Sequence, residues 1–177
     1  MDVIIRAQKM AKKAHKGQKI KWSGLPYIIH PARVAMLVES LRATSRLSVT
    51  GDMVSAAWLH DVVEDSDLTV EDIRQEFGDD VALWVGELTN PVYDGLSRQE
   101  RNEMDFARLA IASNEAKVIK LADRIDNLGG VLSCSSNEKA LRYLEESRLL
   151  LEALGGAQER LESQLYRFIQ IGLTEIG

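Results

Sequence analysis

The sequence has few of the residues that mark several common classes of protein. Its 177 residues include a single cysteine, Cys134, which excludes an internal disulfide and a zinc site built from cysteines. No apolar run approaches the roughly 18 residues that a membrane-spanning helix needs. The first residues also lack the pattern of a signal peptide. We therefore expect a cytoplasmic protein that does not associate with membranes.

Positive charge is also in short supply. There are 22 Lys and Arg against 27 Asp and Glu, a net charge of −5, which argues against nucleic acid as the main partner. The one basic cluster is formed by Lys9, Lys12, Lys13, Lys16, Lys19 and Lys21. We expect Lys12 and Lys13 to be solvated. For the lysines from 16 to 21, two interpretations stay open: a solvated face, or a cationic path that guides a polyphosphate.

Strand patterns are missing as well. No stretch alternates apolar and polar residues, whereas apolar residues recur at helical spacing, which predicts an all-α fold. The length favours a single domain over 1–177. Thr69 with Asp72 and Ser97 with Glu100 predict capping boxes. The expected helices are 2–16, 31–43, 52–64, 69–78, 79–88, 97–112, 115–128, 137–154 and 157–173.

The expected helix 52–64 is apolar nearly all round, which indicates a path through the core. It carries His60, Asp61, Glu64 and Asp65 on one flank, because these residues are separated by one, three or four positions. Three carboxylates at the C-terminal end of a buried helix oppose its dipole, so a bound cation is a natural compensation. The alternative is a solvated helix end with an isolated histidine.

Candidate metal ligands occur on two further helices. We expect His15 to be solvated, whereas His30 precedes Pro31 and is either a helix-capping residue or a rigidly placed ligand. Asp123 and Asn127 share one face of a core-like helix, since they lie four residues apart. As isolated residues they are typical surface polar groups. Two imidazoles and two carboxylates, however, suit a borderline divalent ion such as Mn²⁺, Fe²⁺, Co²⁺ or Zn²⁺.

Three stretches carry a resemblance to a known family. They are Ser23-Gly-Leu-Pro-Tyr-Ile-Ile-His-Pro31, Leu59-His-Asp-Val-Val-Glu-Asp65 and Lys120-Leu-Ala-Asp-Arg-Ile-Asp-Asn127. The spaced His…His-Asp…Asp pattern resembles the HD superfamily of metal-dependent phosphohydrolases. More closely, residues 5–155 resemble the hydrolase domain of RelA/SpoT alarmone enzymes and their stand-alone small relatives. The resemblance implies a helical bundle of about eight to ten helices.

The resemblance also implies roles for individual residues. The implied metal ligands are His30, His60, Asp61 and Asp123, with Mn²⁺ as the family's usual ion and other divalent ions as alternatives. Glu64 and Asp65 match the acidic pair that handles the attacking water. The implied substrate contacts are Ser23 in the loop before His30, Asn127 at the nucleotide sugar, and Tyr143, whose match requires a short gap.

The chain departs from the family pattern at two places. Lys21 and Trp22 stand where the family's loop commonly carries arginine and lysine. Lys21 lacks the planar guanidinium that stacks on a purine. Trp22 either packs the loop down or stacks on the purine itself, with Lys21 facing a phosphate. After Asn127 the chain continues Leu128-Gly-Gly130, where the family often has a basic and a hydroxyl residue.

These patterns favour a Mn²⁺-dependent hydrolase that removes the 3′-pyrophosphate of (p)ppGpp, an alarmone of the stringent response, and leaves GDP or GTP. One alternative is an HD phosphohydrolase acting on an adenine alarmone or a free nucleotide. Another is a nucleotide sensor without catalysis, although a sensor has no need for both Glu64 and Asp65. A small-molecule nucleotide is the expected partner. A homo-oligomer is compatible with the sequence.

Overall fold

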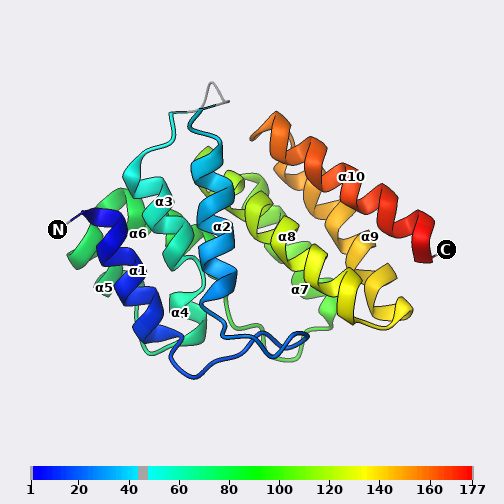
Figure 1. The fold of residues 1–177 in the computed structure, drawn as a ribbon, viewed down its shortest axis with the longest axis horizontal. Helices are drawn as coiled ribbons and strands as arrows, with labels where there is room; N and C mark the ends of the chain where they lie inside the picture. Colours follow the sequence, from blue (N-terminus) through cyan, green and yellow to red (C-terminus); the bar gives the residue numbers. More distant parts are fainter. Residues whose placement is uncertain (1, 44–47, 177) are drawn as a thin grey trace. The chain divides into compact units, whose positions relative to one another are not determined.

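The computed structural model describes residues 2–43 and 48–176, and in these residues every regular element is a helix (Figure 1). The all-α prediction is confirmed. Among these described residues, one pair of bridging residues, Lys19 and Pro26, links the two arms of the loop that precedes Ile29. The helices are α1 (Val3–Ala14), α2 (Ile29–Ser40), α3 (Gly51–Leu59), α4 (Val62–Asp65), α5 (Val70–Phe77), α6 (Asp79–Leu88), α7 (Arg98–Ala110), α8 (Asn114–Cys134), α9 (Asn137–Leu154) and α10 (Glu159–Ile176).

The chain divides into two compact units. The first unit contains the residues up to Ile20 together with Gly24–Asn90. The second contains Lys21–Ser23 and the residues from Pro91 onward. The three residues 21–23 thus leave the first unit and group with α7–α10. The prediction of one domain over 1–177 stays a prediction.

Helix α3 is the core helix of the first unit and packs against α1, α2 and α6. Six of its nine residues are buried, as its apolar sequence predicts. The prediction of one continuous helix over 52–64 is nevertheless wrong. The helix is interrupted at His60 and Asp61, and α4 follows. The His60 ring nitrogen Nδ1 lies 2.8 Å from the Ala57 carbonyl, the acceptor that an uninterrupted helix would offer to the Asp61 amide.

Two other helix boundaries differ from the prediction. Helix α2 begins at Ile29, so His30 lies inside the first turn and is not the N-cap. Pro31 is tolerated there because the first amides of a helix have no intrahelical acceptor. The N-cap of α8 is Ser113, whose hydroxyl accepts from the Ala116 amide, and not Asn114. Both predicted capping boxes are confirmed.

Helix α8 also continues through Gly129 and Gly130 to Cys134, whereas the sequence predicted an end at Leu128. A glycine in a helix interior costs about 1 kcal/mol relative to alanine. The buried side chains of Leu128 and Val131 flank the two glycines and anchor this part of α8 in its unit. Tertiary packing therefore outweighs the local propensity to stop.

In the second unit, α10 packs on α8 and α9. The contact is close at Gly172, where an added Cβ would lie 2.8 Å from Leu144 and 3.0 Å from Leu132. Only glycine allows this approach without displacing a neighbour. The last helix thus packs on its own unit, a point on which the sequence is silent.

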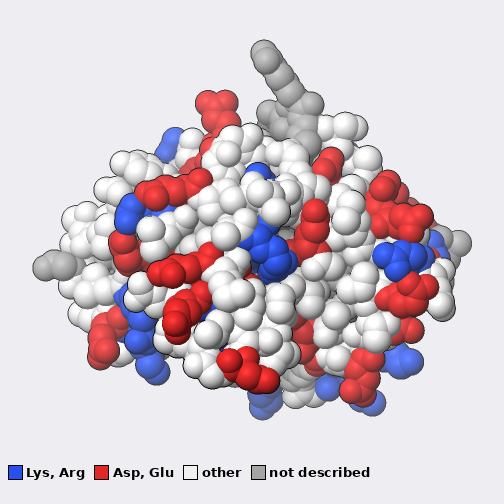
Figure 2. Space-filling model, turned by 180° about the vertical axis from the view of Figure 1, so that it is seen from behind, with Lys and Arg blue, Asp and Glu red and all other residues white. Residues whose placement is uncertain are grey.

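Acidic and basic side chains are interspersed on the face drawn in Figure 2. Such mixing accords with a sequence of modest net charge, −5. Within residues 2–43 and 48–176, none of the helices combines the length and the hydropathy that crossing a bilayer requires.

Candidate metal centre

The first unit brings His30, His60 and Asp61 together, and their ligand atoms all lie within 4.8 Å of one another. The Nε2 atoms of the two histidines are 3.2 Å apart. Asp61 Oδ2 lies 3.1 Å from His60 Nε2 and 3.5 Å from His30 Nε2. Both imidazoles are buried. We refer to these three residues as the triad.

The break between α3 and α4 sets the tautomer of His60. The Ala57 carbonyl can only accept a hydrogen bond, so His60 Nδ1 is the protonated nitrogen. In the neutral ring Nε2 then presents a lone pair toward His30 Nε2 and the Asp61 carboxylate. A lone pair facing a carboxylate is unfavourable unless a proton or a cation lies between them. Two imidazole nitrogens and one carboxylate oxygen are ligands that fit a borderline divalent ion.

Asp61 is held in its ionised form. Burial raises the pKa of its carboxyl group, but His60 and His30, when protonated, lower it by more through their charge and hydrogen bonds, so that the pKa lies well below its usual range. The Tyr27 hydroxyl also donates to Asp61 Oδ2 at 2.6 Å. An anionic carboxylate with a fixed orientation is what a metal ligand requires.

His15 is not solvated, contrary to the prediction from sequence. Its side chain is buried, and its Nδ1 lies 2.8 Å from Gln18 Oε1. The ring packs against Tyr27, with centroids 4.8 Å apart, and the Tyr27 ring in turn packs against His30 at 5.6 Å. Tyr27 therefore contacts two members of the triad, Asp61 and His30, and His15 packs against Tyr27. The sequence analysis missed these roles.

Glu64 and Asp65 lie on α4, directly after the triad in sequence, and both are exposed. Glu64 Oε1 accepts a hydrogen bond from the backbone N–H of Asn90 at 2.6 Å. The backbone carbonyl of Asp65 accepts one from the Gln18 side chain at 2.7 Å. These bonds hold α4 at two points while its carboxylates remain accessible. Neither carboxylate belongs to the triad.

Asp123 belongs to the second unit, on α8, and its side chain is buried. The Lys120 ammonium lies 2.8 Å from Asp123 Oδ2, and the Asn127 amide donates to Oδ1. Both carboxylate oxygens therefore have a donor one helical turn away, and Lys120 compensates the charge. The role of Asp123 as a fourth metal ligand stays a prediction.

Comparison with known proteins identifies the family. The family model described as HD domain matches residues 7–150, which run through both units. This chain belongs to the HD-domain family. The guanosine-3′,5′-bis(diphosphate) 3′-pyrophosphohydrolase MESH1 of Homo sapiens is 33% identical and covers 97% of this chain and 96% of its own length. MESH1 of Drosophila melanogaster is 33% identical over 79% of this chain and 77% of its own.

Two solved structures have a similar fold. The structure of a metazoan SpoT orthologue that hydrolyses ppGpp superposes with a TM-score of 0.86 at 28% identity and covers 97% of this chain and 96% of its own. A Listeria monocytogenes structure gives a TM-score of 0.65 at 27% identity, over 85% of this chain and 99% of that one. HD-domain hydrolases are metal-dependent, and the triad supplies this HD chain with a possible metal site.

The predicted substrate contacts of the HD domain all lie in the second unit. Lys21 and Ser23 are exposed and Trp22 is half-buried. Tyr143 on α9 is covered on one ring face by the Arg124 guanidinium, 4.5 Å from the ring centroid. Burial raises the pKa of the Tyr143 hydroxyl, which therefore stays protonated at neutral pH. A role for each of these residues in substrate binding stays a prediction.

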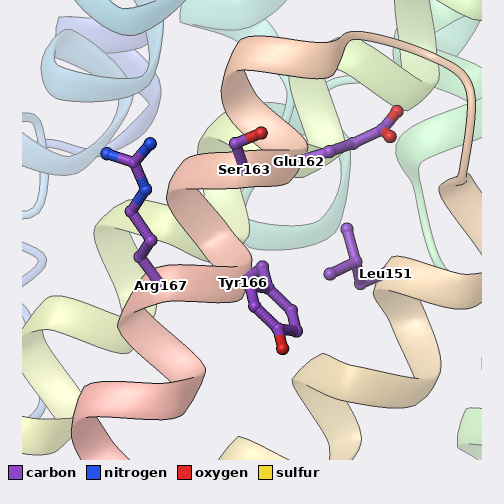
Figure 3. A pocket seen from close by; sticks show the side chains of 5 residues that line it. All are labelled: Leu151, Glu162, Ser163, Tyr166 and Arg167. Atoms are coloured by element: carbon purple, nitrogen blue, oxygen red, sulfur yellow. The ribbon is translucent and has the colours of Figure 1, made fainter.

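A hollow of about 420 Å³ lies between α9 and α10 in the same unit. Five residues line this hollow (Figure 3). The Tyr166 ring lies near Leu151 of α9, and Glu162, Ser163 and Arg167 follow one another along α10. None of these residues belongs to the HD motifs or to the predicted contacts. The hollow is therefore separate in composition from the candidate site.

Proposed function

We propose that this chain is a Mn²⁺-dependent hydrolase that removes the 3′-pyrophosphate of (p)ppGpp and releases GDP or GTP. One observation carries the proposal: His30, His60 and Asp61 converge with the His60 lone pair directed at the carboxylate. That geometry occurs in a chain whose relatives over nearly their full length are named 3′-pyrophosphohydrolases.

The triad and Asp123 are the proposed ligands. When bound, a divalent ion lowers the pKa of a coordinated water and stabilises negative charge on the phosphoryl oxygens. The protein's part is to keep Asp61 anionic and His60 in one tautomer. Carboxylate and imidazole ligands without thiolate suit several borderline divalent ions, and Mn²⁺ is the proposed ion because it is the usual ion of the family that the sequence resembles.

Glu64 and Asp65 are the proposed acid–base pair. Water attacks the phosphorus bound to the ribose 3′-oxygen, and the bond between that phosphorus and the 3′-oxygen breaks. One of the two carboxylates takes a proton from the attacking water, and the other gives a proton to the departing ribose oxygen. Their exposure allows both to reach a solute, and the Asn90 amide orients Glu64.

The proposed nucleotide contacts are those that the family resemblance implies. Asn127 binds the sugar, Ser23 and Lys21 bind polar groups of the nucleotide, and Tyr143 reaches the substrate from α9. Asn127 has its amide nitrogen held by Asp123, which fixes the orientation of the side chain. A cytoplasmic location and a homo-oligomeric state remain predictions.

Turnover by the metal-stripped and metal-restored protein tests the function. Protein treated with a chelator should be inactive on ppGpp, and added Mn²⁺ should restore release of GDP and pyrophosphate in equal amounts. A panel of guanine and adenine 3′-pyrophosphates then separates an alarmone hydrolase of one base from a broader enzyme. Tight binding of ppGpp without turnover at any metal concentration would identify a sensor and contradict the proposal.

A further inference from the structure

Trp22 is seated on Gly130 of α8, and both residues belong to the second unit. A Cβ atom added to Gly130 would lie 2.0 Å from Trp22 Nε1, 2.7 Å from Cε2 and 2.9 Å from Cδ1. Such distances do not occur between real atoms, so any residue other than glycine at 130 would displace the indole. The two places where the chain departs from the family pattern are therefore one structural feature.

The neighbouring glycine provides a contrast. Gly129 precedes Gly130 in the same helix, and a Cβ added there meets nothing within 4 Å. Both positions are partly exposed and both pay the same conformational cost of glycine in a helix. Only Gly130 has a packing reason to lack a side chain, and that reason is Trp22.

The seat lies on a specific face of α8. Asp123, Asn127 and Gly130 are separated by four and then three residues, so they share one face of the helix. Trp22 therefore stands one turn beyond Asn127, whose amide is bound to Asp123. The three distances increase from Nε1 to its two bonded neighbours, which means that α8 meets the nitrogen corner of the indole and not a ring face.

We propose that Gly130 is a positioning residue for Trp22, and that the seated indole forms a stacking wall for the purine of the nucleotide beside Asn127. The proposal rests on the proposed function and adds a substrate class: purine 3′-pyrophosphates of either base. Stacking on an aromatic ring is worth about 1–3 kcal/mol per base and tolerates different bases, because every base has a π face. An edge-seated, half-buried indole keeps ring area for that contact.

A double-mutant cycle tests the proposal, with Gly129→Ala as the matched control. Alanine at 129 should raise Tm by about 1–4 °C, since it removes the cost of one helical glycine. Alanine at 130 should lose that gain, because the new methyl group displaces the indole. In the Trp22→Ala background, alanine at 130 should instead stabilise the protein as it does at 129.

The KM values provide the second arm of the test. Gly130→Ala and Trp22→Ala should each raise KM for ppGpp and for its adenine counterpart by about tenfold, the loss expected when one stacked base contact is removed, with a smaller effect on kcat. The double variant should be no worse than Trp22→Ala alone. Gly129→Ala should leave KM unchanged.

The two arms fail in distinguishable ways. If Gly130→Ala and Gly129→Ala raise Tm equally, the seat itself does not exist and the proposal is overturned. If the Tm cycle shows coupling but KM stays unchanged in Gly130→Ala, Trp22 only packs its loop and the stacking wall is overturned. If no purine 3′-pyrophosphate is hydrolysed by the parent protein, the proposed function fails, while the Tm cycle still tests the seat.

Discussion

Asp61, which is half-buried, and Asp123, which is buried, are two carboxylates, one in each unit, and they are stabilised in opposite ways. Asp61 is surrounded by two imidazoles and a tyrosine hydroxyl. The hydroxyl is neutral, and the imidazoles are neutral unless they are protonated. Asp123 is bound to the ammonium of Lys120 and the amide of Asn127 on its own helix. Buried charge is costly unless it is paired. Asp61 therefore depends on a cation supplied from outside, whereas Asp123 already has one.

Removing an imidazole of the triad gives the largest expected effect. His60→Ala should abolish both metal binding and turnover, because it deletes a ring nitrogen whose lone pair is fixed by the bond of His60 to the Ala57 carbonyl. Metal content per chain and the rate of pyrophosphate release measure the two effects. His15→Ala, which also deletes a buried imidazole, is the control and should lower Tm while the metal is retained. One tightly bound Mn²⁺ per chain in His60→Ala would show that the triad is not the metal site.

Glu64 belongs to neither cluster, so its replacement separates acid–base chemistry from metal retention. General acid–base groups are worth about 10²–10⁴ in rate, and Glu64→Gln should lower kcat by a factor in that range with the metal content unchanged. Asp67→Asn removes another exposed carboxylate close to α4 and should leave kcat as it is. An unchanged kcat in Glu64→Gln would remove Glu64 from the mechanism.

Lys120→Met removes the ion pair that stabilises Asp123 in the second unit. It leaves the Asp123 carboxylate buried without its ammonium, which should lower the free energy of unfolding by about 2 kcal/mol, less than for a fully buried pair. Denaturant unfolding with and without Mn²⁺ measures the loss. The loss should shrink with added Mn²⁺ if Asp123 is a ligand, and a loss that is independent of the ion would count against the fourth-ligand prediction.

A matched substitution on the same helix checks that result. Lys117→Met also removes a lysine from α8, one turn earlier, and should change the free energy of unfolding by less than about 0.5 kcal/mol. Equal losses in the two variants would show that the effect comes from the helix surface and not from Asp123.

Glu146 is a third carboxylate to compare with Asp61 and Asp123. It is partly buried and is paired with Arg98. Burial raises the pKa of Glu146, but the hydrogen bonds and charge of Arg98 lower it by more, so its pKa in the folded protein lies below the unfolded value. Its contribution to stability is thus present above about pH 4.3 and lost as the pH falls further. Glu146→Gln should lower Tm by about 2–4 °C at pH 6, an effect of roughly 1 kcal/mol.

The pH dependence of that difference is the measurement. The gap in Tm between the parent protein and Glu146→Gln should close as the pH is lowered toward 3. Glu145→Gln, which removes the neighbouring exposed carboxylate bound to Arg148, should show a smaller gap at every pH. A gap for Glu146→Gln that is constant between pH 3 and 6 would mean that the ion pair does not contribute.

Much of the architecture is readable from the sequence, because capping residues and apolar spacing are local signals. The capping boxes at Thr69 and Ser97 and the buried helix before His60 are of this kind. The breaks and extensions do not follow from capping residues or apolar spacing. The end of α3 depends on a side-chain bond from His60, and the passage of α8 through two glycines depends on packing against its own unit.

The candidate site shows the same division. Residue types and spacing indicate His60 and Asp61, and the family resemblance adds His30. The burial of His15 does have a signal in the sequence. His15 follows Ala7 and Ala11 at intervals of four, which places it on the buried face of α1. No pattern near Tyr27 announces its bond to Asp61, because the two residues are 34 positions apart.

The seating of Trp22 on Gly130 also makes the two positions unequal in their tolerance of substitution. A tryptophan at 22 opposite any side chain at 130 would overlap with it, whereas a glycine at 130 opposite a smaller residue at 22 leaves only a space. Position 130 therefore accepts only glycine while residue 22 is tryptophan, whereas position 22 accepts smaller residues while residue 130 is glycine.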